Sequence, residues 1–121
     1  MRKILVAEDN AINRELLREL LEFRQYHVTE AGDGQQALDL IAQTRPDIVL
    51  LDLDMPVLDG FATIAKIRQD PALAQLPVIA VTAYAMRGDR EHILGSGFNG
   101  YLPKPVDSAM LVAELSRFLQ T

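Results

Sequence analysis

The segment Pro46-Asp47-Ile48-Val49-Leu50-Leu51-Asp52 places four consecutive aliphatic residues between a proline and an aspartate. An unbroken aliphatic run of this length is typical of a strand that is buried on both faces, as in a parallel sheet. Similar runs occupy residues 4–7 and 78–81, and a shorter one occupies residues 101–102. A more polar, alternating segment at residues 26–31 predicts a weaker strand, so we expect five strands in all.

Apolar residues recur at helical spacing between the predicted strands. We expect helices that begin after residues 9–10, after the turn at 32–34, after residues 59–60, at about residue 86, and at residue 107 or 108. This alternation of strands and helices builds βα units with right-handed crossovers and helices on both faces of the sheet. The predicted fold is α/β, a doubly wound five-stranded parallel sheet with five helices. No linker or repeat interrupts it, so residues 1–121 are expected to form one domain.

The composition is that of an ordinary globular domain and excludes several classes of function. The chain has 121 residues, no cysteine and a net charge of −5. Without cysteine it can form neither a disulfide nor a thiolate metal site. The negative charge argues against binding to nucleic acid or to an anionic membrane surface. No apolar stretch approaches the roughly 20 residues that span a bilayer, and no secretory leader follows Met1, so we expect a cytoplasmic protein.

Polar residues follow the predicted buried strands, and they are Glu8, Asp9, Asp52, Thr82 and Lys104. In an open parallel sheet the carboxyl ends of the strands share one edge, where ligands bind. Three carboxylates in one pocket repel one another, and a hard divalent cation such as Mg²⁺ would relieve that repulsion. An aspartate can attack phosphorus to form an acyl phosphate, a transfer that needs mainly positioning and neutralisation of charge. We therefore expect a metal-dependent phosphoryl-transfer site at this edge.

Short motifs accompany these polar residues in a fixed order along the chain. They are Glu8-Asp9, Asp52, Met55-Pro56, Leu58-Asp59-Gly60, Thr82-Ala83, Tyr101 and Lys104-Pro105. In this order they resemble a response-regulator receiver domain from one end of the chain to the other. The resemblance implies a flavodoxin-like strand order of 2-1-3-4-5. Residues 83–89 are also similar to stand-alone regulators of the DivK type and to receivers of hybrid histidine kinases.

The resemblance implies a role for each residue of the predicted site. Asp52 would take a phosphoryl group from a histidine kinase or a histidine-phosphotransfer protein, and the chain would catalyse only its own phosphorylation and dephosphorylation. Lys104, followed by a cis peptide bond to Pro105, would bind phosphoryl oxygens together with Thr82. Movement of Thr82 would let Tyr101 rotate, which would change the surface that a downstream protein target binds.

The metal ligands also follow from the resemblance. Asp9 and Asp52 would ligate Mg²⁺ directly, Glu8 would act through water, and Asp54 would contribute its backbone carbonyl. The side chains of Asp54 and Tyr84 would border the path of the water that hydrolyses the acyl phosphate, so we expect them to tune the lifetime of the phosphoryl group.

Other interpretations stay open from the sequence alone. The chain could be a receiver domain cut from a longer hybrid kinase, or a pseudoreceiver that serves only for interaction. Asp52-Leu53-Asp54 also resembles the first motif of haloacid-dehalogenase phosphatases, although that family has Thr or Val where this chain has Pro56 and places its nucleophile after the first strand. Asp9-Asn10 can cap the first helix, so Glu8-Asp9 could serve merely as a cap, or Asp9 could do both jobs. Tyr101 could be a core residue of an edge strand.

The first predicted helix carries more apolar surface than contact with a sheet requires. At about 100° per residue, its apolar side chains spread over roughly 180°, and they are Ile12, Leu16, Leu17, Leu20, Leu21 and Phe23. As the resemblance implies, the surplus edge around Leu16 is a candidate docking surface for a phosphotransfer helix, with Asn10, Asn13 and Pro105 at its rim. The alternative is a broad seat against neighbouring helices of the same domain.

Overall fold

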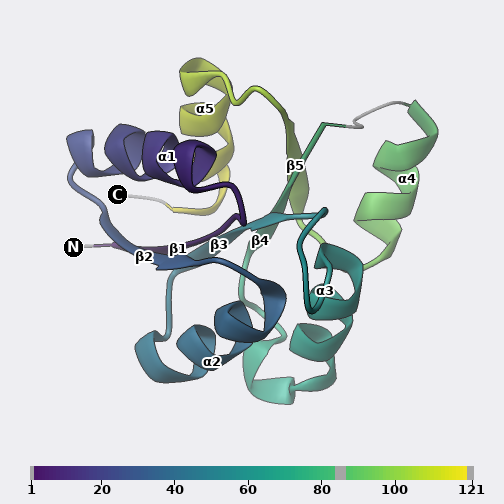
Figure 1. Ribbon diagram of the computed structural model, residues 1–121. Helices are drawn as coiled ribbons and strands as arrows, with labels where there is room; N and C mark the ends of the chain where they lie inside the picture. The colour runs from purple at the N-terminus through teal and green to yellow at the C-terminus, as the bar shows by residue number, and fades with distance from the viewer. Residues whose placement is uncertain (1, 84–86, 120–121) are drawn as a thin grey trace.

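Five parallel strands form the centre of the molecule, in the order β2-β1-β3-β4-β5 that the resemblance implied (Figure 1). The structure is a computed structural model, and it describes residues 2–83 and 87–119. The strands are β1 Lys3–Ala7, β2 His27–Ala31, β3 Ile48–Asp52, β4 Val78–Thr82 and β5 Gly100–Pro103. Each predicted strand is therefore present, with boundaries shifted by one or two residues.

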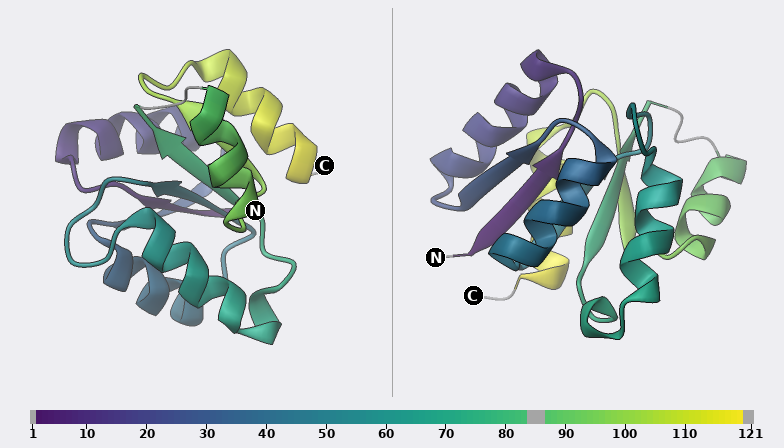
Figure 2. Two further views of the ribbon diagram at one scale, coloured as in Figure 1. Left: turned by 90° about the vertical axis from the view of Figure 1, so that its right-hand side faces the viewer. Right: turned by 60° about the horizontal axis from the view of Figure 1, so that its bottom comes forward.

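Helices cover both faces of the sheet, as predicted for a doubly wound fold. They are α1 Ala11–Phe23, α2 Gly34–Thr44, α3 Gly60–Gln69, α4 Arg87–Gly95 and α5 Ser108–Phe118, with a short 3₁₀ turn, η1 Pro71–Leu73, after α3. Helices α1 and α5 lie on one face, and α2 and α3 lie on the other (Figures 1 and 2). The start that we predicted for α4, Met86, lies outside the described residues. The turn η1 was not predicted; the Asp70 side chain accepts a hydrogen bond from the Ala72 amide at its start.

Alternate side chains of the strands enter two separate hydrophobic cores. Leu5, Val49, Leu51 and Ala80 pack with the helices α2, α3 and α4, whose members of this core include Ile41, Ile64 and Ile93. Ile4, Val6, Leu50 and Val81 pack with α1 and α5, whose members include Leu17, Leu21, Leu111 and Leu115. Every residue of β3 is buried, which explains its unbroken aliphatic run. The edge strand β2 is buried only at Ala31, which explains its more polar sequence.

Four helices begin with a side chain that caps the first turn. The caps are Asn10 for α1, Asp33 for α2, Asp59 for α3 and Asp107 for α5, and each accepts a hydrogen bond from an amide two or three residues later. The cap predicted at Asp9-Asn10 is confirmed at Asn10, and the alternative that Glu8-Asp9 serves merely as that cap is wrong. The caps fix where each helix starts beyond its strand, and so they fix the shape of the edge where the predicted site residues lie.

Helix α1 buries a narrower face than its composition suggested. Only Leu17 and Leu21 are buried. The remaining large apolar residues are exposed, at 70% for Ile12, 54% for Leu16, 36% for Leu20 and 87% for Phe23. These four residues, which we call the α1 stripe, lie three or four positions apart and therefore share one face of the helix. The prediction of a surplus apolar edge is confirmed, and the alternative of a broad seat within the domain is wrong.

The close packing of Gly60 predicts that a larger residue there would destabilise the loop after Asp52. A Cβ atom added to Gly60 would lie 2.6 Å from the Leu53 Cα and 2.8 Å from the Asp52 carbonyl oxygen. Gly60→Ala should therefore lower the free energy of unfolding by about 1–3 kcal/mol, because the loop after Asp52 must shift. Gly95→Ala is the matched control, since a Cβ there meets no atom within 4 Å. Urea denaturation measures both variants, and equal effects would contradict the close packing of Gly60.

Candidate functional site

Strand register brings the predicted polar residues to one edge of the sheet. Ala7 is paired with Leu51, so the next residues, Glu8 and Asp52, lie side by side on neighbouring strands. On the other side, Thr82 at the end of β4 is paired with Pro103, the residue before Lys104. The Lys104 amide donates to the Thr82 carbonyl oxygen at 2.8 Å, which extends the sheet by one more bond. Backbone pairing alone therefore gathers side chains that are separated by as many as 96 positions in sequence.

Three carboxylates meet at this edge, as the sequence predicted. Oxygen atoms of Glu8, Asp9 and Asp52 all lie within 4.8 Å of one another. Glu8 and Asp52 are only 2% exposed, whereas Asp9 is exposed to solvent. Carboxylate oxygens at this spacing are suited to a hard divalent cation that keeps part of its hydration shell, as Mg²⁺ does.

Lys104 forms ion pairs with both buried carboxylates. Its Nζ atom lies 2.9 Å from Asp52 Oδ2 and 3.1 and 3.2 Å from the two oxygens of Glu8. Burial by itself would lower the pKa of Lys104, but hydrogen bonds and attraction from Asp52 and then Glu8 outweigh it and raise the pKa. The lysine therefore stays charged and offsets part of the negative charge of the cluster.

The buried position of Glu8 beside Asp52 perturbs its pKa. Burial, followed by the hydrogen bond and the charge of Asp52, raises the pKa of Glu8 to about 7. Hydrogen bonds from Asn13 and Lys104 oppose this rise. Asn13 Nδ2 donates to Glu8 Oε1 at 3.1 Å, and Arg14 Nη1 donates to the Glu8 carbonyl oxygen at 2.8 Å. The charge of Asp52 therefore adds to the effect of burial on the pKa of Glu8.

The loop after Asp52 holds the carboxylate in one orientation. The Asp54 amide donates to Asp52 Oδ1 at 3.1 Å, while Lys104 occupies Oδ2. The Asp54 side chain is exposed, and it lines a groove of about 410 Å³ together with Thr82, Asp89 and His92. Of the predicted site residues, Asp54 thus shares this groove with Thr82. Tyr84, which we expected beside it, lies outside the described residues.

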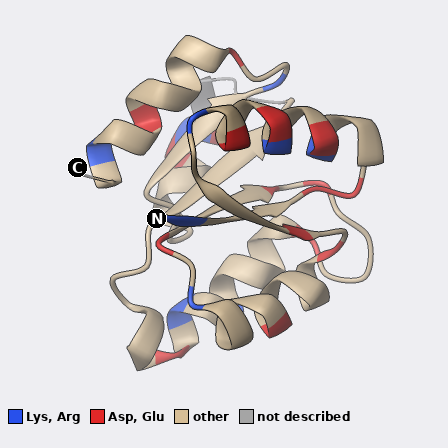
Figure 3. Ribbon diagram, turned by 90° about the vertical axis from the view of Figure 1, so that its left-hand side faces the viewer, with Lys and Arg blue, Asp and Glu red and all other residues tan. Residues whose placement is uncertain are grey.

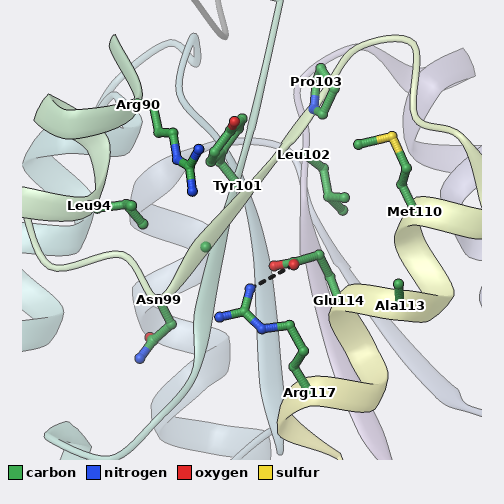
Figure 4. A pocket seen from close by; sticks show the side chains of 11 residues that line it. Arg90, Leu94, Asn99, Tyr101, Leu102, Pro103, Met110, Ala113, Glu114 and Arg117 are labelled. Atoms are coloured by element: carbon green, nitrogen blue, oxygen red, sulfur yellow. Dashed lines mark hydrogen bonds and ion pairs between the residues drawn. The ribbon is translucent and has the colours of Figure 1, made fainter. Parts of the chain in front are cut away.

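Thr82 and Tyr101 lie at different depths. Thr82 is buried at the end of β4, and Tyr101 is half-buried in β5. Tyr101 lines a groove of about 400 Å³ between α4, β5 and α5 (Figure 4). The Arg90 guanidinium carbon lies 5.7 Å from the centre of the Tyr101 ring. The peptide bond between Lys104 and Pro105 is cis, which confirms that prediction.

The four residues that we predicted for partner binding, Leu16 and the rim residues Asn10, Asn13 and Pro105, lie at or near the same edge. Leu16 is exposed on α1, Asn10 is exposed just before it, and Pro105 is exposed in the loop after β5. Asn13, Leu16 and Pro105 line a small hollow of about 120 Å³ that also reaches Glu8 and Lys104. Charged residues of both signs alternate along α1 beside this surface (Figure 3). Arg18, for example, forms ion pairs with Glu22 on α1 and Glu30 on β2.

Sequence reasoning missed three contacts of the site. These are the hydrogen bond of Asn13 to the Glu8 side chain, the support of the Glu8 backbone by Arg14, and the contact of Arg90 with Tyr101. Asn13 was assigned only to the rim of a docking surface. Arg14 and Arg90 lie on helices rich in charge, where the sequence has no signal that separates a site contact from a solvated side chain.

Comparison with known proteins agrees with this geometry. The family model of the response regulator receiver domain matches residues 4–116. The chain belongs to this family. It is a receiver domain of two-component and phosphorelay systems, and this membership decides against the haloacid-dehalogenase alternative.

Three relatives illustrate the range of the family. The chain is 35% identical over 118 residues to the polar-differentiation response regulator DivK of Brucella anthropi, covering 98% of this chain and 96% of DivK. It is 38% identical to the receiver domain of the sensor histidine kinase PA1611 from Pseudomonas aeruginosa PAO1, with a TM-score of 0.91 and coverage of 99% and 98%; that crystal structure has a magnesium ion in its active-site cleft. The third is the Ssk1 receiver domain of Saccharomyces cerevisiae, crystallised with the histidine phosphotransfer protein Ypd1. That chain is 27% identical, with a TM-score of 0.89 and coverage of 97% and 88%.

Within residues 2–83 and 87–119, no helix is long and apolar enough to cross a membrane.

The raised pKa of Glu8 predicts that the free energy of unfolding depends on pH. The pKa of Glu8 is about 7 in the folded chain and about 4.5 in the unfolded chain. Between these values the folded chain keeps the proton that the unfolded chain has lost. The free energy of unfolding therefore falls as the pH rises through this window, by at most about 3 kcal/mol. Glu8→Gln removes the titration. In metal-free buffer its free energy of unfolding should rise relative to the parent chain between about pH 5 and about pH 8. Parallel curves in urea denaturation would contradict the raised pKa.

Proposed function

We propose that Asp52 accepts a phosphoryl group from a phosphohistidine and that the resulting acyl phosphate controls binding of a partner. An Asp52 carboxylate oxygen attacks phosphorus, the phosphorus–nitrogen bond breaks, and its electron pair leaves with the imidazole. The observation that carries the proposal is the contact of Lys104 Nζ with both Asp52 and Glu8 in one buried cluster. A buried acid cluster with a shared ammonium group is expensive for folding alone, so a functional role explains it.

Mg²⁺ is the cofactor that fits these residues. Asp9 and Asp52 would hold it directly and Glu8 through water, with the backbone carbonyl of Asp54 as a further ligand. The close grouping of the three carboxylates and the raised pKa of Glu8 support this assignment. When bound, Mg²⁺ would neutralise charge on the carboxylates and on the phosphoryl oxygens.

The remaining residues would hold the transferred group and report its presence. Lys104 would turn from the carboxylates toward a phosphoryl oxygen, and the Thr82 hydroxyl would hydrogen-bond another. Thr82 lines the groove beside Asp54, and Tyr101 lines the groove over the neighbouring strand β5. Inward movement of Thr82 would free space for the Tyr101 ring. Rotation of this half-buried ring would reshape the groove between α4 and α5 where a downstream target could bind.

The phosphodonor would be a histidine kinase or a histidine-phosphotransfer protein that docks on α1. Support comes from the α1 stripe, which is apolar, exposed and adjacent to the site through Leu16. Asn10, Asn13 and Pro105 would form the polar and rigid rim of that contact. The complex of the related Ssk1 receiver with Ypd1 supports this class of partner.

We propose that residues 1–121 act as one receiver domain in the cytoplasm, where ATP-charged histidine kinases carry their phosphohistidine. The chain would catalyse only its own phosphorylation and dephosphorylation. Relatives include both the regulator DivK and the receiver of a sensor kinase, so the same chemistry serves either parent protein.

The acceptor assignment predicts the result of labelling with a small phosphodonor. Acetyl phosphate with Mg²⁺ should produce an acid-stable, alkali-labile phosphoryl group on the parent chain, and Asp52→Asn should abolish it, because an amide cannot form the acyl phosphate. Asp54→Asn is the matched control, since it removes a neighbouring carboxylate and should keep the label. Intact-mass measurement reads all three proteins. Undiminished labelling of Asp52→Asn would refute the assignment.

Metal binding predicts a stabilisation that depends on the acid cluster. Mg²⁺ at about 100 times its dissociation constant should raise the free energy of unfolding by about 3 kcal/mol, because it binds the folded chain only. Asp9→Asn should remove most of this gain, while Asp59→Asn, which changes a helix cap away from the cluster, should keep it. Thermal melts with and without EDTA measure the effect. A melting temperature that ignores Mg²⁺ in the parent chain would contradict the site.

The position of Asp54 predicts that its substitution changes the lifetime of the phosphoryl group on Asp52. Two effects compete, since its carboxylate repels the phosphoryl charge, by about 3 kcal/mol at ~6 Å and a dielectric constant near 20, but can also orient the attacking water. We expect water orientation to dominate because the exposed side chain shares a groove with Thr82. Asp54→Ala should therefore lengthen the lifetime several-fold and leave labelling nearly unchanged. A shorter lifetime in a dephosphorylation time course would show that repulsion dominates.

A further inference from the structure

The loop between Asp52 and α3 contains a valine in an unfavourable backbone conformation. Val57 has φ of 69°, in the left-handed region, and among the described residues only Gln25 and Arg45 share this feature without being glycine. The Leu58 amide donates to the Pro56 carbonyl oxygen at 2.7 Å and closes a three-residue turn around Val57. A β-branched residue tolerates this region poorly because its Cβ substituents crowd the backbone.

Neighbouring contacts fix the backbone of this turn. The Leu58 carbonyl oxygen lies so close to Gly34 of α2 that a Cβ there would overlap it. The Gly60 amide donates to the Leu53 carbonyl oxygen at 2.9 Å, which closes the loop from the other end. Pro56 fixes its own φ through its ring. The chain must therefore turn at position 57, whatever residue stands there.

The type of residue at position 57 is a separate matter. Glycine or asparagine would adopt the same turn with less strain. The valine side chain is 81% exposed, so it contributes little to either core. Folding therefore gains little from the valine side chain, and an exposed apolar residue in a strained turn five positions after Asp52 is a candidate for a role in function.

The position of Val57 suggests what it contacts. The loop leaves the sheet at Asp52 and joins α3, on the face of the sheet opposite α1 (Figure 1). Ile12, which is 70% exposed, lies in the first turn of α1 on the other face. Asp52, only 2% exposed, lies at the end of β3 between these two helical layers. A protein that presents a phosphohistidine to Asp52 must cover this edge, whereas a small phosphodonor can enter without touching the loop.

We propose that Val57 is a specificity-determining residue for phosphotransfer, whose side chain makes an apolar contact with the helix that carries the donor phosphohistidine. This inference rests on the proposed function and adds a second contact region to the α1 stripe. The partner would present an aliphatic or aromatic side chain within a turn or two of its phosphohistidine, on the side that faces α3. The contact would accelerate transfer from a protein donor and leave transfer from a small donor unchanged.

The test compares two donors across three variants. The donors are acetyl phosphate and the purified histidine kinase or phosphotransfer domain from the source genome that labels the parent chain fastest. Val57→Asn keeps the turn and removes the apolar side chain, so kcat/KM with the protein donor should fall about tenfold, as for loss of a central interface contact. Its rate with acetyl phosphate should stay the same. Val57→Ile keeps an apolar side chain and should retain the rate with both donors.

Gln25→Asn is the matched control for relief of backbone strain. Gln25 has φ of 70° and follows the last turn of α1, at the opposite end of that helix from the site. Both asparagine variants should melt at or above the temperature of the parent chain, and Gln25→Asn should change neither rate. A Val57→Asn protein that melts lower, slows with both donors, or keeps its rate with the protein donor would overturn the inference. Labelling of Asp52 by acetyl phosphate judges the proposed acceptor separately, so that proposal can stand when this one fails.

Discussion

The shared ammonium group of Lys104 is the interaction on which the site depends. Glu8 and Asp52 are almost fully buried on neighbouring strands, and two carboxylates in that position could not both stay charged without a cation close by. Lys104 reaches both from β5, at distances of 2.9 to 3.2 Å. Its own backbone is held by the carbonyl of Thr82, so the position of the charge is set by the sheet rather than by a flexible loop. Removal of Lys104 would take away the positive charge that both buried carboxylates contact, while the hydrogen bonds from Asn13 to Glu8 and from the Asp54 amide to Asp52 would stay.

The single positive charge of Lys104 only partly balances the negative charges of the three carboxylates, and this remaining negative charge suits a regulated site. Three carboxylates face one ammonium group, and Glu8 retains a raised pKa despite the hydrogen bonds from Asn13 and Lys104. A divalent cation would complete the balance, and a phosphoryl group would then give Lys104 a new partner. The charge at the site would therefore differ between these states. Such a local change of charge on a rigid base is a general way to bias an element that has two positions.

Exposed apolar residues lie on both helical layers around the edge of the sheet that carries Asp52. The α1 stripe lies on one layer, and the strained turn at Val57 belongs to the other. Neither contributes to the hydrophobic cores, which are filled by Leu17, Leu21 and Ile64 among others. A contiguous exposed apolar face such as the α1 stripe is typical of a surface that contacts another protein. The groove beside Tyr101 is separate from both and lies over β5, at the end of the sheet.

The sequence by itself determined the fold class, the positions of the strands and the residues of the acid cluster. It could do so because burial on two faces demands unbroken aliphatic runs such as 48–51, and because parallel strands must end at a common edge. Only the tertiary structure decided which helix residues face outward: Leu16 and Leu17 are equally apolar, yet only Leu17 reaches the core, since the seat of α1 depends on the neighbouring layer. The same holds for the pairing of Lys104 with Glu8, which lie 96 positions apart. This pairing depends on the distance between segments far apart in the chain, which no local pattern encodes.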